Sequence, residues 1–253
     1  MKQLFILIIL SLAAIISFSQ QTYITKGKIE FEKKENVYRS IDMMAEQWDK
    51  VGSDWIDNVK KNTQQFAINY YDLYFDGNKS LYKSGREVPD QKTDNYWQSA
   101  AKENVIFTDL QQGRITAQKK IYGSIFLIED SFRTIEWRYT NETREIAGFE
   151  CHKAVGRMLD SIYVVAFYTN QILTNSGPES FNGLPGMILG LAIPRLNTTW
   201  FATKLELAPI TPTDLTPPAK GKKLTYAAYD KTLIDLMKDW GKYGKRRMLQ
   251  AII

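Results

Sequence analysis

Cys151 and His152 are the residues that first suggest covalent chemistry, because a thiol beside an imidazole can act as an activated nucleophile. They are the single cysteine and the single histidine of the 253 residues. Both lie in the run 149–158, whose composition predicts a β-strand, and successive strand residues point to opposite faces of a sheet. The two side chains therefore cannot meet as nucleophile and base. We assign neither residue a catalytic role and expect the thiol of Cys151 to be buried.

Familiar catalytic and metal-binding motifs are absent from the sequence. It contains no G-x-S-x-G, H-E-x-x-H or C-x-x-C motif and no phosphate-binding loop. One cysteine excludes a disulfide framework and a cysteine-rich zinc site, and one histidine excludes a histidine-rich metal centre. We expect no catalytic residue, no metal and no cofactor. The remaining candidates are scattered carboxylates, whose spacing does not pair them across a cleft: Glu129, Asp130, Glu136, Glu142 and Glu145.

The N-terminus has the pattern of a secretory signal peptide, which we place at residues 1–19. Lys2 supplies a positive charge, an apolar run extends from Leu4 to Phe18, and small residues flank Phe18 before Gln20. The run is shorter than the roughly 20 residues that a membrane-spanning helix requires. No cysteine lies near the cleavage point, so we expect no lipoprotein anchor. The sequence predicts an exported protein, in the periplasm or associated with the outer membrane.

Basic residues are concentrated at the other end of the chain. Residues 220–253 hold nine Lys or Arg and three Asp, whereas the whole chain has a net charge of +5. Apolar residues recur at helical spacing from Tyr229 to Trp240, which predicts a basic amphipathic helix. We expect this tail to dock on an anionic membrane surface or a partner, and export makes nucleic acid an unsuitable partner. The docking residues predicted are Lys238, Trp240, Lys242, Lys245, Arg246 and Arg247.

Residues 20–210 have the pattern of a mainly antiparallel β domain, because short alternating runs follow one another without long helices between them. One exception is an apolar stripe from Val37 to Trp55, which predicts an amphipathic helix at 36–58. Residues 211–219, with three prolines, are expected to form a linker to the tail. The predicted fold class is α+β, with a curved sheet or open barrel, an N-terminal amphipathic helix and a C-terminal basic helix.

Individual strands follow from alternation and from turn residues such as Asp76-Gly77. A short helix is expected at 96–102 within a polar loop. The strands are expected at 23–31, from 65 up to the turn at 76, and at 80–83, 105–110, 115–121, 125–129, 134–139, 149–158, 162–169, 187–193 and 200–207.

The segment before residue 187 has the most distinctive sequence. Leu184-Pro185-Gly186-Met187 predicts a type II turn, because proline presets the first central φ and glycine accepts the positive φ that follows. The apolar run from Met187 to Ile193 then predicts a strand that is buried on both faces. We assign Gly183, Leu184, Pro185 and Gly186 as a binding or structural motif.

These residues carry a family resemblance. The motif Gly183-Leu184-Pro185-Gly186-Met187-Ile188, together with residues 146–154, 167–169 and 177–178, resembles the GLPGLI family of small exported proteins found chiefly in Bacteroidota. The sequence departs from the family motif at Met187. The resemblance implies a protein outside the cytoplasm, sometimes encoded near outer-membrane TonB-dependent receptors. It brings no catalytic residues.

The expected function is therefore that of a non-enzymatic envelope protein. We expect a binding or accessory protein that works with an outer-membrane TonB-dependent transporter or another envelope protein. One alternative is a soluble carrier of an apolar ligand or peptide, since 13% of the residues are aromatic and Trp97, Trp137 and Trp200 lie in or near the expected sheet. The other alternative is a hydrolase with an unrecognised carboxylate site.

Overall fold

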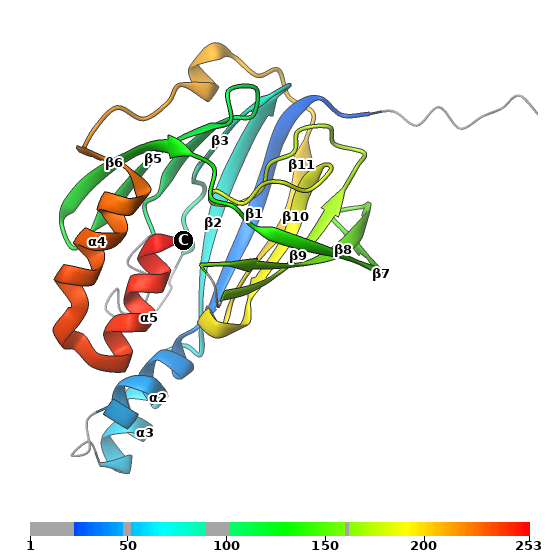
Figure 1. The fold of residues 1–253 in the computed structure, drawn as a ribbon. Helices are drawn as coiled ribbons and strands as arrows, with labels where there is room; N and C mark the ends of the chain where they lie inside the picture. The colour runs from blue at the N-terminus through cyan, green and yellow to red at the C-terminus, as the bar shows by residue number, and fades with distance from the viewer. Residues whose placement is uncertain (1–22, 48–51, 90–101, 160–161) are drawn as a thin grey trace, which may run out of the picture.

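The computed structural model describes residues 23–47, 52–89, 102–159 and 162–253. They form one open sheet of twelve strands in the order β12-β6-β5-β4-β3-β2-β1-β11-β10-β9-β8-β7. The sheet curves around two C-terminal helices, α4 and α5, while α2 and α3 extend from one end (Figure 1). Every strand pair is antiparallel except β12 with β6. The sheet is not closed into a barrel.

The strands of the sheet are β1 (Lys26–Asn36), β2 (Phe66–Asp76), β3 (Lys79–Ser84), β4 (Val105–Asp109), β5 (Arg114–Ile121), β6 (Ser124–Ser131), β7 (Glu136–Ile146), β8 (Phe149–Met158), β9 (Ile162–Thr169), β10 (Met187–Ile193), β11 (Thr198–Glu206) and β12 (Lys222–Leu224). The prediction of a mainly antiparallel β fold is confirmed. Several strands are longer than predicted, because pairing with the neighbouring strand continues past the apolar residues from which the strand was predicted.

The helices are α2 (Val37–Gln47), α3 (Ser53–Lys61), α4 (Tyr226–Met237) and α5 (Gly241–Ile252), with 3₁₀ turns η1 (Pro194–Leu196), η2 (Pro212–Leu215) and η3 (Lys238–Trp240). A single N-terminal helix at 36–58 is not confirmed. Two separate helices occupy this part of the chain, Gly52 caps the second, and α3 has no buried residue. Ile56 and Val59 of α3 are partly buried against the apolar residues of α2, whereas Trp55, the last residue of the predicted stripe, is exposed.

The core lies between the concave face of the sheet and the C-terminal helices. Tyr229, Leu233 and Met237 of α4 belong to the same apolar cluster as the strand residues Phe126 and Ile128. The tail is thus packed on the sheet, although the sequence suggested a separate segment.

Residues 211–219 contain η2, which a capping box between Thr211 and Asp214 stabilises.

Two further predictions concern parts of the chain outside the described residues. The predicted signal peptide at 1–19 lies there, and so does nearly all of the helix predicted at 96–102. Among the described residues, no helix is both long enough and apolar enough to cross a membrane.

Candidate functional site

The predicted motif at 183–186 forms a turn in which glycine is required by the fold. Gly186 has a φ of +140°, and a Cβ atom there would lie 2.1 Å from the carbonyl oxygen of Thr169 at the end of β9. Leu184 is buried. The N–H of Gly186 donates to the carbonyl of Leu184 at 2.8 Å. This hydrogen bond closes a turn of three residues, which is tighter than the predicted four-residue type II turn.

The loop that precedes this turn carries a carboxylate into the core. Glu179 is 2% exposed and has a φ of +54°, a conformation that costs free energy for a residue with a Cβ. Its Oε2 accepts a hydrogen bond of 2.8 Å from Nδ2 of Asn104, and its Oε1 lies 3.5 Å from Nζ of Lys33. The strained loop thus holds Glu179 against a lysine of β1.

Aromatic rings surround this buried ion pair. Nζ of Lys33 lies 5.0 Å from the ring centroid of Trp200 and 5.8 Å from that of Tyr71, which stacks on Tyr82. Burial, and after it the nearby carboxylate of Glu179, raises the pKa of Tyr82 well above its ordinary value. The same two causes raise the pKa of Tyr71, so both phenols are neutral near pH 7.

A small polar cavity lies beside the ion pair, under α5. Its volume is about 10 Å³, which is the space that one water molecule needs. At the edge of the cavity, Oε1 of Glu35 accepts a hydrogen bond of 2.9 Å from Nε2 of Gln250. Two carboxylates thus flank Lys33, but the cavity has no room for a substrate in this arrangement. It is lined by Lys33, Glu35, Leu196, Thr198, Trp200, Gln250 and Ile253.

The sequence patterns described above did not predict this cluster. Lys33 and Glu35 lie on the same buried face of β1 as Ile29 and Phe31, at the two-residue spacing of a strand. Extending the predicted strand beyond Phe31 with this spacing would have placed both residues in the core. Glu179 gives no such signal, because it lies in a loop.

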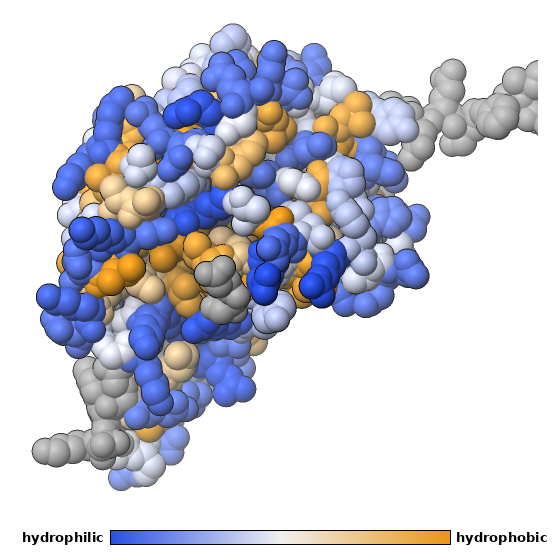
Figure 2. Space-filling model, in the orientation of Figure 1, coloured by the Kyte–Doolittle hydropathy of each residue, from blue (hydrophilic) through white to orange (hydrophobic). Residues whose placement is uncertain are grey.

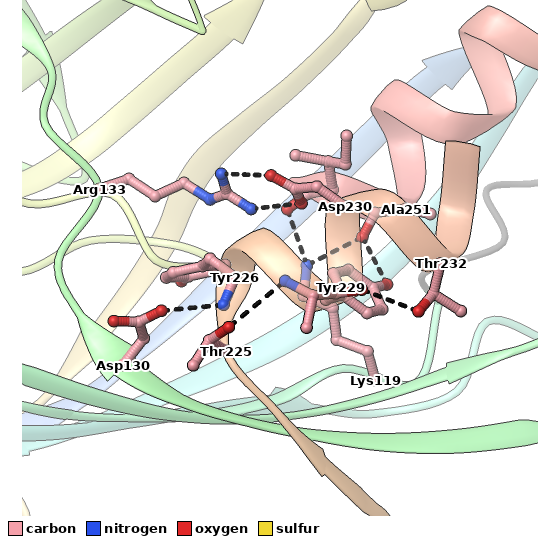
Figure 3. A network of polar contacts seen from close by, with 11 residues as sticks. Lys119, Asp130, Arg133, Thr225, Tyr226, Tyr229, Asp230, Thr232 and Ala251 are labelled. Carbon is pink, nitrogen blue, oxygen red and sulfur yellow. Dashed lines mark hydrogen bonds and ion pairs between the residues drawn. The ribbon is translucent and has the colours of Figure 1, made fainter. Parts of the chain in front are cut away.

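Polar contacts fix the start of α4 to the sheet (Figure 3). The guanidinium of Arg133 donates two hydrogen bonds, of 2.9 and 2.7 Å, to the carboxylate of Asp230. Asp130 accepts a bond of 2.9 Å from the backbone N–H of Tyr226, and the Thr225 hydroxyl caps the helix by accepting from Ala228. A bidentate pair of this kind fixes orientation as well as position.

The end of α5 is fixed by a buried lysine of β5. Nζ of Lys119 donates to the carbonyl oxygens of Ala251 and Ile252 at 3.2 and 3.3 Å, and the Tyr229 hydroxyl donates to Ala251 at 3.0 Å (Figure 3). The final carbonyls of a helix lack partners within the helix, and a cation complements its dipole. Burial lowers the pKa of Lys119 to about 8.

The predicted docking residues separate into two groups. Lys238, Trp240, Lys242 and Lys245 are exposed. Arg246 and Arg247 are 3% and 5% exposed, so their prediction as surface residues is wrong. Both lie on the side of α5 that packs inward. Arg246 donates to the carbonyl of Arg195 at 3.1 Å and to that of Leu196, and Arg247 lies over the ring of Tyr243.

The exposed group surrounds the corner where α4 leads into α5. Trp240 is 37% exposed and packs on Tyr122, which is 49% exposed, with 5.4 Å between the ring centroids. Leu236 is 46% exposed. Figure 2 shows hydrophobic side chains interleaved with hydrophilic ones on this face of the molecule. We call the surface formed by Tyr122, Leu236, Lys238, Trp240, Lys242 and Lys245 the basic corner.

The predicted burial of the Cys151 thiol is confirmed. Cys151 is fully buried and free, and burial raises its pKa to about 12. The ring of His152 lies 5.8 Å from that of Tyr168. The described residues contain no group of three or more His, Cys, Asp or Glu side chains placed to hold a metal ion.

Comparison with known families places one match on the segment that contains this loop and turn. Residues 156–190 match a Bacteroidota-associated family described as "Protein of unknown function (Porph_ging)". The matched segment includes Glu179 and the motif at 183–186. A comparison with curated proteins finds no match.

The fold is similar to part of a larger protein of known structure. PNGF-II, in two crystal forms, is similar with TM-scores of 0.51 and 0.50 and sequence identities of 14% and 13% over 82% and 81% of this chain. This chain spans only 33% and 32% of the PNGF-II chains. An uncharacterized conserved protein from Thermus thermophilus has a TM-score of 0.39 and 7% identity, with 85% of this chain and 99% of that chain covered. At these identities the PNGF-II similarity concerns the fold alone.

Proposed function

We propose that the protein is an exported, non-enzymatic binding or accessory protein of the cell envelope, which attaches to an anionic membrane surface through the basic corner. The proposal includes membership of the GLPGLI family, a location in the periplasm or at the outer membrane, and cooperation with a TonB-dependent transporter. The predicted signal peptide and the motif at 183–186 support the location. The transporter is proposed from the family resemblance.

The basic corner is the observation that carries this proposal. Leu236 and Trp240 expose large apolar surfaces beside the ammonium groups of Lys238, Lys242 and Lys245. Trp is favoured at the membrane interface because one side of the ring system is apolar and the N–H is polar. Each lysine near an anionic leaflet contributes about 1 kcal/mol of attraction. The three lysines outnumber the exposed carboxylates of Asp235 and Asp239 in the same segment, so the corner keeps a positive charge that suits an anionic lipid surface.

The alternatives receive less support from the described residues. A carrier with a sheet-lined cavity would need an open concave face, whereas α4 and α5 pack into it. A hydrolase would need room for a substrate near two carboxylates, and the cavity between Glu35 and the Lys33–Glu179 pair is about 10 Å³. The filled concave face and the small cavity both favour a function at the outer surface of the helices.

Vesicle binding tests the proposal. The mature chain is mixed with vesicles of phosphatidylcholine alone or with about 30% phosphatidylglycerol added, and the bound fraction is measured by sedimentation at about 0.05 and 0.5 M salt. We expect binding to the anionic vesicles at low salt, and a loss of at least tenfold for the variant Leu236→Ser/Trp240→Ala/Lys238→Gln. Equal binding to both vesicle types, or no binding, would contradict the proposal.

A control variant separates local from general charge effects. Lys26→Gln, Lys79→Gln and Lys220→Gln together remove three exposed lysines outside the basic corner. We expect this variant to keep most of its binding. A tagged pull-down from native envelopes, with mass spectrometry of the recovered proteins, tests the transporter separately. Recovery of a stoichiometric outer-membrane receptor is expected, and recovery of the protein alone would contradict that part.

A further inference from the structure

A groove between α2, η1 and α5 combines apolar walls with a cluster of cations. Its volume is about 170 Å³. Met43, Leu196 and Leu249 supply apolar surface, and none of the described residues that line it is acidic. The cations are supplied by η1 and by the first two turns of α5: Arg195, Lys242, Lys245 and Arg246.

Arg246 distinguishes this groove from an ordinary basic surface. Its side chain is almost completely buried, yet its partners are neutral: the carbonyl oxygens of Arg195 and Leu196 and, at 3.4 Å, Oδ1 of Asn197. Nε has no hydrogen-bond partner within the described part of the chain. A guanidinium that is removed from water without a directly bonded anion is costly to the fold.

The electrostatic surroundings of Arg246 point the same way. Burial lowers the pKa of Arg246, the charge of Glu35 opposes this shift, and the charge of Arg247 adds to it. None of the ion pairs among the described residues involves Arg246, Lys242 or Lys245. A ligand anion in the groove would therefore meet three cations that no carboxylate of the described chain neutralises at close range.

We infer that this groove binds a single-chain anionic amphiphile. An oxyanion, carboxylate or phosphate, pairs with the guanidinium of Arg246 and with Lys242 and Lys245, because an Arg fork suits both anions. The first part of the apolar chain lies against Met43, Leu196 and Leu249. The size of the groove favours one chain over the two chains of a bilayer phospholipid. This inference goes beyond membrane attachment and does not depend on it.

Calorimetric titration below the critical micelle concentration tests this inference. The probes are laurate and dodecyl phosphate, with dodecanol as the neutral analogue and acetate and inorganic phosphate as anions without the chain. We expect at least tenfold tighter binding of the two amphiphiles than of any of the other three. Equal binding of dodecanol would overturn the role of the anion, and equal binding of acetate or inorganic phosphate would overturn the role of the chain. No binding of either amphiphile would overturn the site.

Two substitutions locate the binding. Arg246→Gln should weaken laurate binding at least tenfold. Because Arg246 is buried, a second variant avoids an effect on folding: Met43→Glu places a carboxylate in the groove and should also abolish binding. Met43→Gln is the matched neutral control and should change the affinity less than threefold. Unchanged affinity of Met43→Glu would overturn the site.

The basic-corner variant Leu236→Ser/Trp240→Ala/Lys238→Gln separates this inference from the proposed function, because none of its three positions lines the groove. It should bind laurate as the unmodified chain does while failing to sediment with anionic vesicles. The two sites share Lys242 and Lys245 but differ in their apolar residues, so a joint loss of both activities would contradict a groove that binds laurate without Leu236 and Trp240.

Discussion

Lys33 of β1 and Glu179 of the loop before β10 form an ion pair in the core, with Nζ 3.5 Å from Oε1 and side chains that are 4% and 1% exposed. Asn104 donates to the other carboxylate oxygen, so the carboxylate is bound from two distant parts of the chain. The turn at Gly186 follows this loop directly. The best-marked motif of the sequence thus belongs to the segment that places a buried charge.

Glu179→Gln should lower the free energy of unfolding by about 3–5 kcal/mol, because it leaves the ammonium of Lys33 buried without its counter-charge. The double variant Lys33→Met/Glu179→Leu should recover most of this loss, since it removes both charges. Urea unfolding followed by tryptophan fluorescence gives the values. Glu136→Gln breaks the exposed pair with Arg157 and serves as control, with an expected change under about 1 kcal/mol. Equal effects of the two single substitutions would contradict a special role for the buried pair.

Gly186→Ala should destabilise the protein by more than about 2 kcal/mol, since the added Cβ meets the carbonyl of Thr169 and the φ of +140° is strained for alanine. Gly148→Ala is the matched control. Gly148 also has a positive φ, of +82°, but its Cβ would meet nothing within 4 Å, so a loss of about 1 kcal/mol is expected. Comparable losses at the two positions, measured by chemical unfolding, would argue against the close approach at β9.

Cys151 should resist alkylation in the folded protein. Burial raises its pKa to about 12, so the thiolate that reacts with iodoacetamide is nearly absent at about pH 8. Intact-mass measurement after about one hour should show no adduct without denaturant and one adduct in concentrated guanidinium. Rapid labelling of the folded chain would show that this strand opens readily.

Lys119 should give a pH-dependent contribution to stability. Its pKa is about 8 in the folded protein, against an ordinary value of 10.5. The unfolded chain therefore binds more protons between these values, and stability from this group rises as the pH increases from about 8 to 10.5. The full change is on the order of 3 kcal/mol.

The comparison with Lys119→Met isolates this contribution, because methionine does not titrate. The free energy of unfolding of the unmodified chain minus that of the variant should increase between about pH 7 and about pH 10. A difference that stays constant or falls with pH would mean that the ammonium is not desolvated in the folded protein.

Local pattern was sufficient for many of the elements. Short strand-like runs predicted β8 and β9, and a continuous apolar run predicted β10, with the bounds that the structure has. The residue type predicted a buried Cys151. These features depend on the period of a strand and on the transfer of apolar side chains from water, which are properties of neighbouring residues. The need for glycine at residue 186 was also readable, because proline and glycine impose their own dihedral angles.

Tertiary structure alone decided the rest. The sequence marked Arg246 and Arg247 as surface cations, yet both are buried where α5 packs against α2, α4 and η1. It carried no signal that Glu179 meets Lys33, because this pairing depends on the path of a loop across the sheet. Helix orientation and contacts between distant segments are set by how the whole core packs, whereas sequence periodicity reports only on one element at a time.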